Sequence, residues 1–310
     1  MKPMRALLIY LVFVFAGAAI VAPLVWEITH HVEFLSSAAL IKRSPFHRYV
    51  SRCLTGLALI GLPWYYRRLG FHSWKELGIS GFKTQFRLFL QGACIGLATL
   101  LGLGALLLLF GARDFGTLTA KDVITAVLSA TLTGILVGCM EELLFRAALF
   151  QSLYRSSSYW PAVIVSSGVY ALFHFFSKPA PPAEVHSWTG FLILGGMLKG
   201  FVNWRELLPA FLNLFCAGAI LASGLAWKKQ LGFGIGIHAG WIFTLKLNAT
   251  ITRPVEGHNE WIWGTSKLID GWIALPILIG IWLFFERMRG KNETPAAYDV
   301  KVSRPPKNVA

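Results

Sequence analysis

The chain has 310 residues, of which 55% are hydrophobic and only 14% are charged. Because a soluble domain carries about 25% charged residues, this composition excludes an ordinary soluble protein and indicates an integral membrane protein. The net charge of +14 does not indicate nucleic-acid binding. Much of the excess lies in Lys/Arg clusters beside apolar runs, as in the cytoplasmic loops of membrane proteins; they are Arg67/Arg68, Lys228/Lys229, and Arg287, Arg289 and Lys291.

The first apolar run, residues 6–26, has 21 residues without a charge. That length crosses a ~30 Å hydrocarbon core as a helix, and it exceeds the hydrophobic region of a usual signal peptide. No later run shows the alternation of a β-barrel, so we predict an all-α, polytopic membrane helical bundle of about eight transmembrane helices. The predicted spans are 6–26, 50–66, 88–110, 122–155, 159–176, 207–227, 231–247 and 268–285.

Residues 1–287 are predicted to form one membrane-embedded domain, and the polar residues 288–310 a disordered cytoplasmic tail. Lys and Arg gather on one side of an eight-span arrangement, which places both termini in the cytoplasm. Two segments fit less well: 27–49 is basic on the outer side, and 190–206 is apolar but short, so each is expected to be interfacial or re-entrant. The four cysteines form no CxxC pair and are predicted to be buried free thiols.

The fourth span is unusually long and contains three charges. Its 34 residues would extend ~51 Å as a helix, so it must tilt or project from the membrane. Glu142 and Arg146 are four residues apart and are predicted to pair on one helix face. Glu141 is rotated by ~100° from Glu142, which leaves it free for another role. Alternatively, the charges form a simple salt bridge where the helix leaves the membrane.

Two histidines lie in other apolar spans, His174 in "VYALFHFF" and His238 in "LGFGIGIHAGWIF". Glu141 and His174 lie at similar distances from the turn near residue 157, so two antiparallel helices would place them at the same depth. Each histidine alone is compatible with a role in the core. Acid and imidazole groups that converge inside a bilayer, however, indicate a functional site. We expect the three side chains to face a polar cavity that opens toward Lys228 and Lys229.

Two chemistries suit this set of residues. In the first, a carboxylate in a low-dielectric site acts as general base on water, one histidine orients the water, and the other donates to the oxyanion. In the second, Glu141, His174 and His238 bind a divalent metal such as zinc and leave a position open for water. The sequence does not choose between these alternatives.

The order and spacing of these motifs resemble the CAAX prenyl endopeptidase and bacteriocin-processing (CPBP) family of intramembrane proteases. "EELLFR" is similar to its EExxxR motif, Tyr170–His174 to FxxxH, and His238–Ile242 to HxxxN, within about 120–248. The resemblance implies an all-helical membrane protease that cleaves near prenylated or hydrophobic C-termini, or a role in bacteriocin maturation and immunity. It implies that Glu141 is the base and His174 its partner, that His238 is the oxyanion donor, and that Glu142 and Arg146 organise the site.

The chain departs from the family motifs at two positions. Tyr170 replaces phenylalanine, which is a conservative change, and Ile242 replaces the asparagine that would donate to the oxyanion. Loss of such a donor typically costs ~10²–10³ in rate. Asn248 is no local substitute, because it lies ~15 Å along the helix from His238. Asn213 on the preceding span is a candidate substitute, or else a residue that only bonds between helices.

The sequence therefore predicts an intramembrane endopeptidase of a bacterial inner membrane. Its expected partners are a peptide or a prenylated or hydrophobic-tailed protein as substrate, and membrane lipids, but no nucleic acid. One alternative is a non-proteolytic binding, immunity or scaffold protein of the same family, which Ile242 favours. Another is a proton-coupled transporter, although the chain lacks paired interrupted spans in its two halves.

Overall fold

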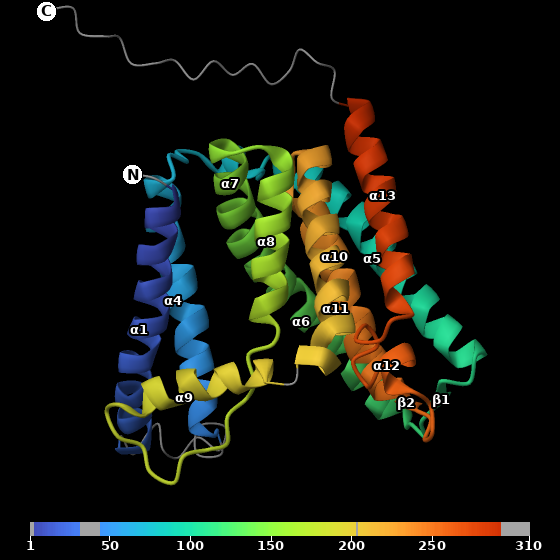
Figure 1. The fold of residues 1–310 in the computed structure, drawn as a ribbon, viewed down its shortest axis with the longest axis horizontal. Coiled ribbons are helices and arrows are strands. Elements are labelled where there is room, and N and C mark those ends of the chain that lie inside the picture. The colour runs from blue at the N-terminus through green and yellow to red at the C-terminus, as the bar shows by residue number, and fades with distance from the viewer. Residues whose placement is uncertain (1–2, 32–43, 203, 293–310) are drawn as a thin grey trace, which may run out of the picture.

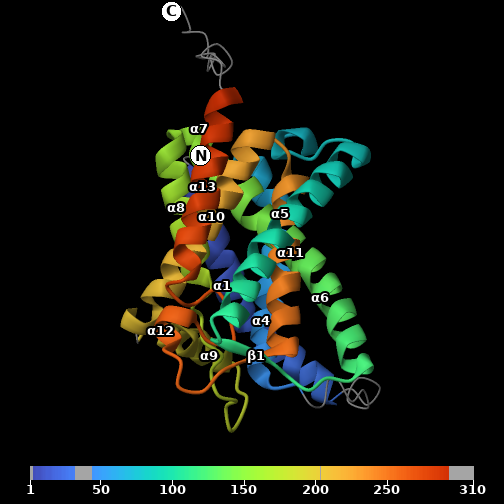
Figure 2. The same ribbon diagram turned by 90° about the vertical axis from the view of Figure 1, so that its right-hand side faces the viewer.

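The computed structural model describes residues 3–31, 44–202 and 204–292. They form a bundle of helices with one small two-stranded sheet at one end (Figures 1 and 2). The predicted all-α class is correct for the bundle, and each predicted span overlaps a helix. The bundle helices are α1 (Pro3–His31), α4 (Phe46–Arg68), α5 (Phe82–Leu109), the continuous run 120–156, α8 (Tyr159–Phe173), α10 (Trp204–Lys228), α11 (Leu231–Ile251) and α13 (Ala274–Asn292).

Four helical stretches of the described chain are long and apolar enough to cross a membrane. Their number and length indicate an integral membrane protein. α8 has only 15 residues, which at 1.5 Å per residue do not span a ~30 Å core by themselves. The count of eight crossings therefore stays a prediction. The four stretches are Arg5–His31, Trp74–Leu109, Ala120–Ser156 and Leu207–Lys228.

The long fourth span consists of α6 (Ala120–Glu141), a π-helical segment η2 (Glu142–Phe150) and α7 (Gln151–Ser156). A capping box starts it, because the Thr119 hydroxyl accepts from the Asp122 backbone N–H while the Asp122 carboxylate accepts from that of Thr119. In Figure 2 the N-terminal part of α6 slants away from the bundle, as expected for so long a helix. π-Helical turns inside α-helices often mark functional sites, and this one begins directly after Glu141.

The ambiguous segment 190–206 contains the short helix α9 (Thr189–Met197) and a 3₁₀ turn, η3 (Leu198–Phe201). α9 lies across the ends of α1 and α4 instead of running along them (Figure 1). Gly190 packs directly on α1, since a Cβ there would lie 2.0 Å from the carbonyl oxygen of Ala19. That this segment is interfacial or re-entrant in the membrane stays a prediction. The other ambiguous segment, 27–49, falls largely on residues 32–43, outside the described residues.

The two-stranded sheet was not predicted from the sequence. β1 (Arg113–Phe115) pairs antiparallel with β2 (Thr252–Pro254) and so joins the ends of α5 and α11. Arg113 is buried there; its Nε donates to the Thr252 hydroxyl at 2.7 Å and its Nη1 to the Thr265 carbonyl at 2.8 Å. Burial lowers the pKa of Arg113, and the nearby Asp270 carboxylate acts in the opposite direction. The short helix α12 (Glu260–Trp263) also lies at this end of the bundle.

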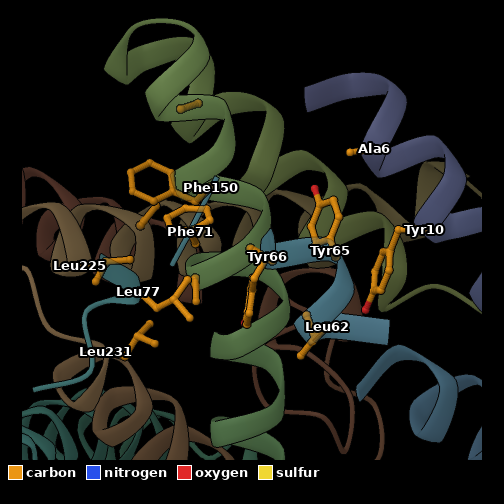
Figure 3. Packing of buried hydrophobic residues seen from close by; sticks show 14 of the residues in the cluster. Ala6, Tyr10, Leu62, Tyr65, Tyr66, Phe71, Leu77, Phe150, Leu225 and Leu231 are labelled. Carbon is orange, nitrogen blue, oxygen red and sulfur yellow. The ribbon is translucent and has the colours of Figure 1, made fainter. Parts of the chain in front are cut away.

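Aromatic residues of α1 and α4 pack against the fourth span (Figure 3). The rings of Tyr10 and Tyr65 stack with centroids 4.7 Å apart, and the Tyr10 hydroxyl donates to the Ala58 carbonyl at 2.7 Å. The Tyr66 hydroxyl donates to the Leu143 carbonyl of η2 at 2.9 Å. α4 thus fixes the π-helical segment that carries the charged residues.

α5 and α11 approach each other closely enough for their backbones to touch. A Cβ on Gly92 would lie 2.1 Å from the Phe233 carbonyl oxygen, and one on Gly236 would lie 2.0 Å from the Phe89 carbonyl oxygen. Small residues at helix contacts permit this approach and are typical of packing inside membranes. The contact sets the position of α11, and with it the position of His238.

The two described ends of the bundle lie on the same side, since α1 begins and α13 ends there (Figure 1), in agreement with an even number of crossings. Helix α13 continues to Asn292, so its last turn lies within the predicted tail, 288–310. Arg289 pairs within this helix with Glu286 at 2.9 Å, and the Tyr159 hydroxyl of α8 also donates to Glu286. These contacts stabilise a helix where composition alone predicts disorder. The rest of the predicted tail, 293–310, lies outside the described residues.

All four cysteines are free, as predicted, but they are not uniformly buried. Cys216 is buried, whereas Cys94 is exposed on α5 and the other two are intermediate. The prediction of four buried thiols is therefore wrong for Cys94. An apolar run on a membrane helix includes the face turned to lipid, so membership of such a run does not imply burial inside the protein.

Candidate active site

The side chains of Glu141, His174 and His238 converge from three helices. Glu141 is the last residue of α6, His174 directly follows α8, and His238 lies near the middle of α11. Oε2 of Glu141 lies 3.8 Å from Nε2 of His174 and 3.5 Å from Nε2 of His238. The prediction that Glu141 and His174 lie at the same depth is thus confirmed. The structure also brings His238 to the same point.

The three side chains differ in exposure. His174 is 31% exposed, Glu141 is 17% exposed and His238 is 4% exposed. The site therefore has an accessible side at His174 and a closed side at His238. A molecule that enters must pass His174 and Glu141 before it reaches His238.

Glu142 and Arg146 form the predicted pair, with Nε of Arg146 3.5 Å from Oε1 of Glu142. The pair is fully buried inside the protein, at 0% and 2% exposure, so it is not a salt bridge on the protein surface. Nη2 of Arg146 also donates to the Gly218 carbonyl of α10 at 3.2 Å. The guanidinium lies 4.4 Å from the ring centroid of Tyr170, a cation–π contact. Arg146 therefore links η2 to both α8 and α10.

His238 lies between the two carboxylates. Its Nδ1 is 3.4 Å from Oε1 of Glu142, and its Nε2 is 3.5 Å from Oε2 of Glu141. Because each nitrogen faces a different carboxylate, Glu142 holds the ring while Glu141 stands at its other end. Figure 2 shows how α11 passes beside α6, which brings the ring to this point.

His174 is held by its own helix. Its Nδ1 lies 2.9 Å from the carbonyl oxygen of Tyr170, one turn earlier. A carbonyl only accepts hydrogen bonds, so Nδ1 carries the hydrogen and, in the neutral ring, Nε2 carries the lone pair. That lone pair faces Glu141.

Residues 123–244 match the model of a protein family described as type II CAAX prenyl endopeptidase Rce1-like. This segment is therefore similar to that family. It covers less than half of the chain, and it includes all five residues of the site described above. The resemblance to the CPBP family that the three motifs indicated is therefore confirmed for this segment. No curated protein and no solved structure matches the chain.

The metal alternative gains no support from the arrangement of side chains. Within residues 3–31, 44–202 and 204–292, no group of three or more His, Cys, Asp or Glu side chains is placed to hold a metal ion. We therefore derive no step through a metal.

An apolar cavity of about 330 Å³ adjoins the Rce1-like site. Glu141 and His174 belong to its wall, and apolar residues of α1, α4, η2 and α8 form the rest. The expectation of a polar cavity is thus wrong in character, because α1 and α4 turn apolar faces toward the fourth span, and neither Lys228 nor Lys229 belongs to the cavity lining. The lining residues outside the site include Val14, Leu54, Ala58, Phe145, Val169 and Phe173.

Asn213 does not serve the site. Its side-chain Nδ2 donates to the carbonyls of Ile269 and Gly271, both at 2.8 Å. Both amide hydrogens are therefore bonded to residues outside the three motifs. The interpretation of Asn213 as a substitute oxyanion donor is therefore wrong, and that of a structural amide is correct. Sequence reasoning overlooked a different polar group: the Tyr170 hydroxyl lies 3.5 Å from Nε2 of His238. The sequence feature that could have indicated it is Tyr170, which replaces the phenylalanine of the FxxxH motif.

Proposed function

We propose that the protein is an intramembrane endopeptidase that hydrolyses a peptide bond near a prenylated or otherwise hydrophobic C-terminus. The observation that supports this most is the Glu141 carboxylate, which faces two histidine Nε2 atoms at 3.5 and 3.8 Å beside an apolar cavity. The cavity suits the lipid tail, and the polar cluster suits the peptide bond. The Rce1-like segment supports the same reaction class.

The separation of Glu141 and His174 suits a bound water. Oε2 of Glu141 and Nε2 of His174 are both hydrogen-bond acceptors, and at 3.8 Å they are too far apart for a direct hydrogen bond. One water molecule can donate a hydrogen to each of them. As its oxygen attacks the peptide carbonyl carbon, Glu141 accepts a proton from it, and the same proton then passes to the leaving amine nitrogen.

His238 stands where the carbonyl oxygen becomes negative. An N–H at its Nε2 stabilises that oxygen as a preorganised donor. Glu142 holds the opposite nitrogen at 3.4 Å, and Arg146 holds Glu142. Glu142 and Arg146 are therefore positioning residues, whereas Glu141, His174 and His238 contact the reacting atoms.

The apolar cavity is suited to bind the hydrophobic tail of the substrate. Its volume of about 330 Å³ lies within the usual range for ligand pockets, ~300–1,000 Å³. Because Glu141 and His174 form part of its wall, a tail bound there keeps the adjoining peptide bond next to the carboxylate. The shared wall of cavity and site supports this substrate class.

The test is cleavage of a farnesylated peptide by the purified protein in detergent, followed by mass spectrometry. Glu141→Gln keeps the shape of the side chain but removes the base, so we expect a loss of at least ~10²-fold in kcat with unchanged thermal stability. Glu286→Gln, which alters a part-buried carboxylate outside the site, is the matched control and is expected to cleave. Equal cleavage by the parent and Glu141→Gln contradicts the proposal.

Ile242 supports a second candidate, a binding protein that does not cleave. Ile242 lies where the motif has an asparagine, and its side chain contains no hydrogen-bond donor. Binding of the lipidated peptide by both the parent and Glu141→Gln, with no cleavage product from the parent, favours this candidate. Cleavage that depends on Glu141 removes it.

A further inference from the structure

Tyr170 places a buried hydroxyl at the closed side of the site. The residue lies on α8, one turn before His174, and is 3% exposed. Its hydroxyl oxygen is 3.5 Å from Nε2 of His238. The same nitrogen faces Oε2 of Glu141 at 3.5 Å. The hydroxyl of Tyr170 and the carboxylate of Glu141 therefore both face this nitrogen.

The tyrosine ring is fixed independently of its hydroxyl. The Arg146 guanidinium lies 4.4 Å from the ring centroid, and the ring of Phe145 packs against it edge to face at 5.2 Å. The His174 ring lies 4.5 Å away on the same helix. A phenylalanine would keep all three ring contacts. What the hydroxyl adds is one polar group directed at His238, and packing does not require that group.

We propose that the Tyr170 hydroxyl is a second donor to the oxyanion and fills the role that Ile242 cannot fill. A phenol hydroxyl can donate its hydrogen, so Tyr170 and the Nε2–H of His238 can each donate to the same carbonyl oxygen. Asn213, the other polar candidate, donates to Ile269 and Gly271 instead. The proposal rests on the proposed peptide hydrolysis and deepens it.

The step moves no proton through tyrosine. The water oxygen forms a bond to the carbonyl carbon, the carbonyl π pair moves to the oxygen, and the water proton goes to Glu141. Tyr170 and His238 each donate a hydrogen bond to the new oxyanion. When the carbon–nitrogen bond breaks, the pair returns to the carbonyl and Glu141 delivers its proton to the leaving amine. Tyr170 therefore acts on the tetrahedral state and not on substrate binding.

The experiment compares the parent with Tyr170→Phe on the farnesylated peptide. Removing one oxyanion donor is expected to lower kcat by about 10²-fold and to leave KM unchanged, because the interaction exists only in the transition state. Tyr159→Phe is the matched control. It removes another buried hydroxyl of α8, one that bonds Ser223 and Glu286, and is expected to retain the parent's kcat.

Two further measurements separate a donor from a residue that merely orients His238. Adding Ile242→Asn to Tyr170→Phe is expected to restore kcat at least tenfold, and Ile242→Thr serves the same purpose if the asparagine variant does not fold. A peptidyl phosphinate, whose tetrahedral oxygens imitate the intermediate, is expected to bind Tyr170→Phe more weakly than the parent by the factor lost in kcat/KM.

The outcomes are distinct. A Tyr170→Phe protein that cleaves like the parent overturns the proposal. So does a fall in kcat that neither position-242 variant restores and that leaves phosphinate affinity unchanged, because Tyr170 then only orients His238. If the parent itself never cleaves, the proposed function fails and the donor role fails with it. In the first two cases the parent is active, so the two failures cannot be confused.

Discussion

The carboxylate of Glu142 lies directly against Gly234 of α11, and a Cβ on that glycine would stand 2.5 Å from Oε2 of Glu142. The absent side chain leaves room for a fully buried carboxylate between η2 and α11. Gly234 is one turn before His238, so the same helix both makes space for Glu142 and presents the imidazole that Glu142 holds.

We expect Gly234→Ala to displace Glu142 and to lower both thermal stability and peptide cleavage. Replacing an exposed glycine in a helix by alanine normally stabilises a protein by ~1 kcal/mol. A loss of stability in Gly234→Ala therefore has to come from the contact with Glu142. Gly168→Ala on α8 is the control, because no atom of the described chain lies within 4 Å of its Cβ position. Thermal unfolding in detergent measures both. A Gly234→Ala protein as stable and active as the control contradicts the role of this contact.

The buried pair of Arg146 and Glu142 gives a second prediction. Arg146→Ala leaves a carboxylate at 0% exposure without its cation, a change that costs about 3–5 kcal/mol. The double variant Arg146→Met/Glu142→Gln removes both charges and should unfold at a higher temperature than Arg146→Ala. Equal melting temperatures would show that the lost contacts to Gly218 and Tyr170, which both variants lack, determine the effect and not the unpaired charge.

Local spacing accounts for the part of the site that the sequence predicted. Glu142 and Arg146 share a helix, so an offset of four residues was enough to pair them. Glu141 and His174 lie on adjacent helices joined by a short turn, so counting residues from that turn gave their common depth. Both predictions need only helical geometry and the direction of the chain.

The features that were missed depend on how closely distant helices approach. The contact of Tyr170 with His238 joins residues 68 positions apart, and its length depends on the tilt of α8 against α11. The space beside Gly234 depends on the distance between η2 and α11. The apolar character of the cavity depends on which faces of α1 and α4 turn inward. Helical periodicity alone does not determine these interhelical distances and rotations.

The metal question leads to a third prediction. Because no group of three or more His, Cys, Asp or Glu side chains in the described residues is placed to hold a metal ion, we expect protein dialysed against a chelator to keep its cleavage activity and to contain no stoichiometric zinc by elemental analysis. Activity that disappears on dialysis and returns with zinc would instead support these three residues as ligands. Thermal unfolding before and after dialysis controls for loss of fold.

Asn213 should matter for stability and not for the reaction. Its side chain donates to two carbonyls, those of Ile269 and Gly271, and a buried polar group left without its partner costs ~1–3 kcal/mol. We expect Asn213→Leu to lower the melting temperature clearly while the folded fraction keeps the parent's kcat. Asn259→Ala, at an exposed helix cap, should have a smaller effect. A selective fall in kcat without a change in melting temperature would return Asn213 to the site.

The apolar cavity can be tested with one substitution made at two positions of α8. Val169 belongs to the cavity wall, whereas Val165, one turn earlier, is 43% exposed on the outer face. Val169→Phe fills part of the space, and if it displaces two methylene groups of the tail it removes about 1.6 kcal/mol of binding at ~0.8 kcal/mol each. We therefore expect KM for a farnesylated peptide to rise roughly tenfold, with a smaller change for a peptide carrying a shorter tail.

Val165→Phe adds the same side chain to the same helix and should leave KM unchanged. Because both variants keep Glu141 and His174, a rise confined to Val169→Phe assigns the tail to this cavity. An equal response of the two variants, or none, places the tail elsewhere and separates the cavity from the chemistry at Glu141.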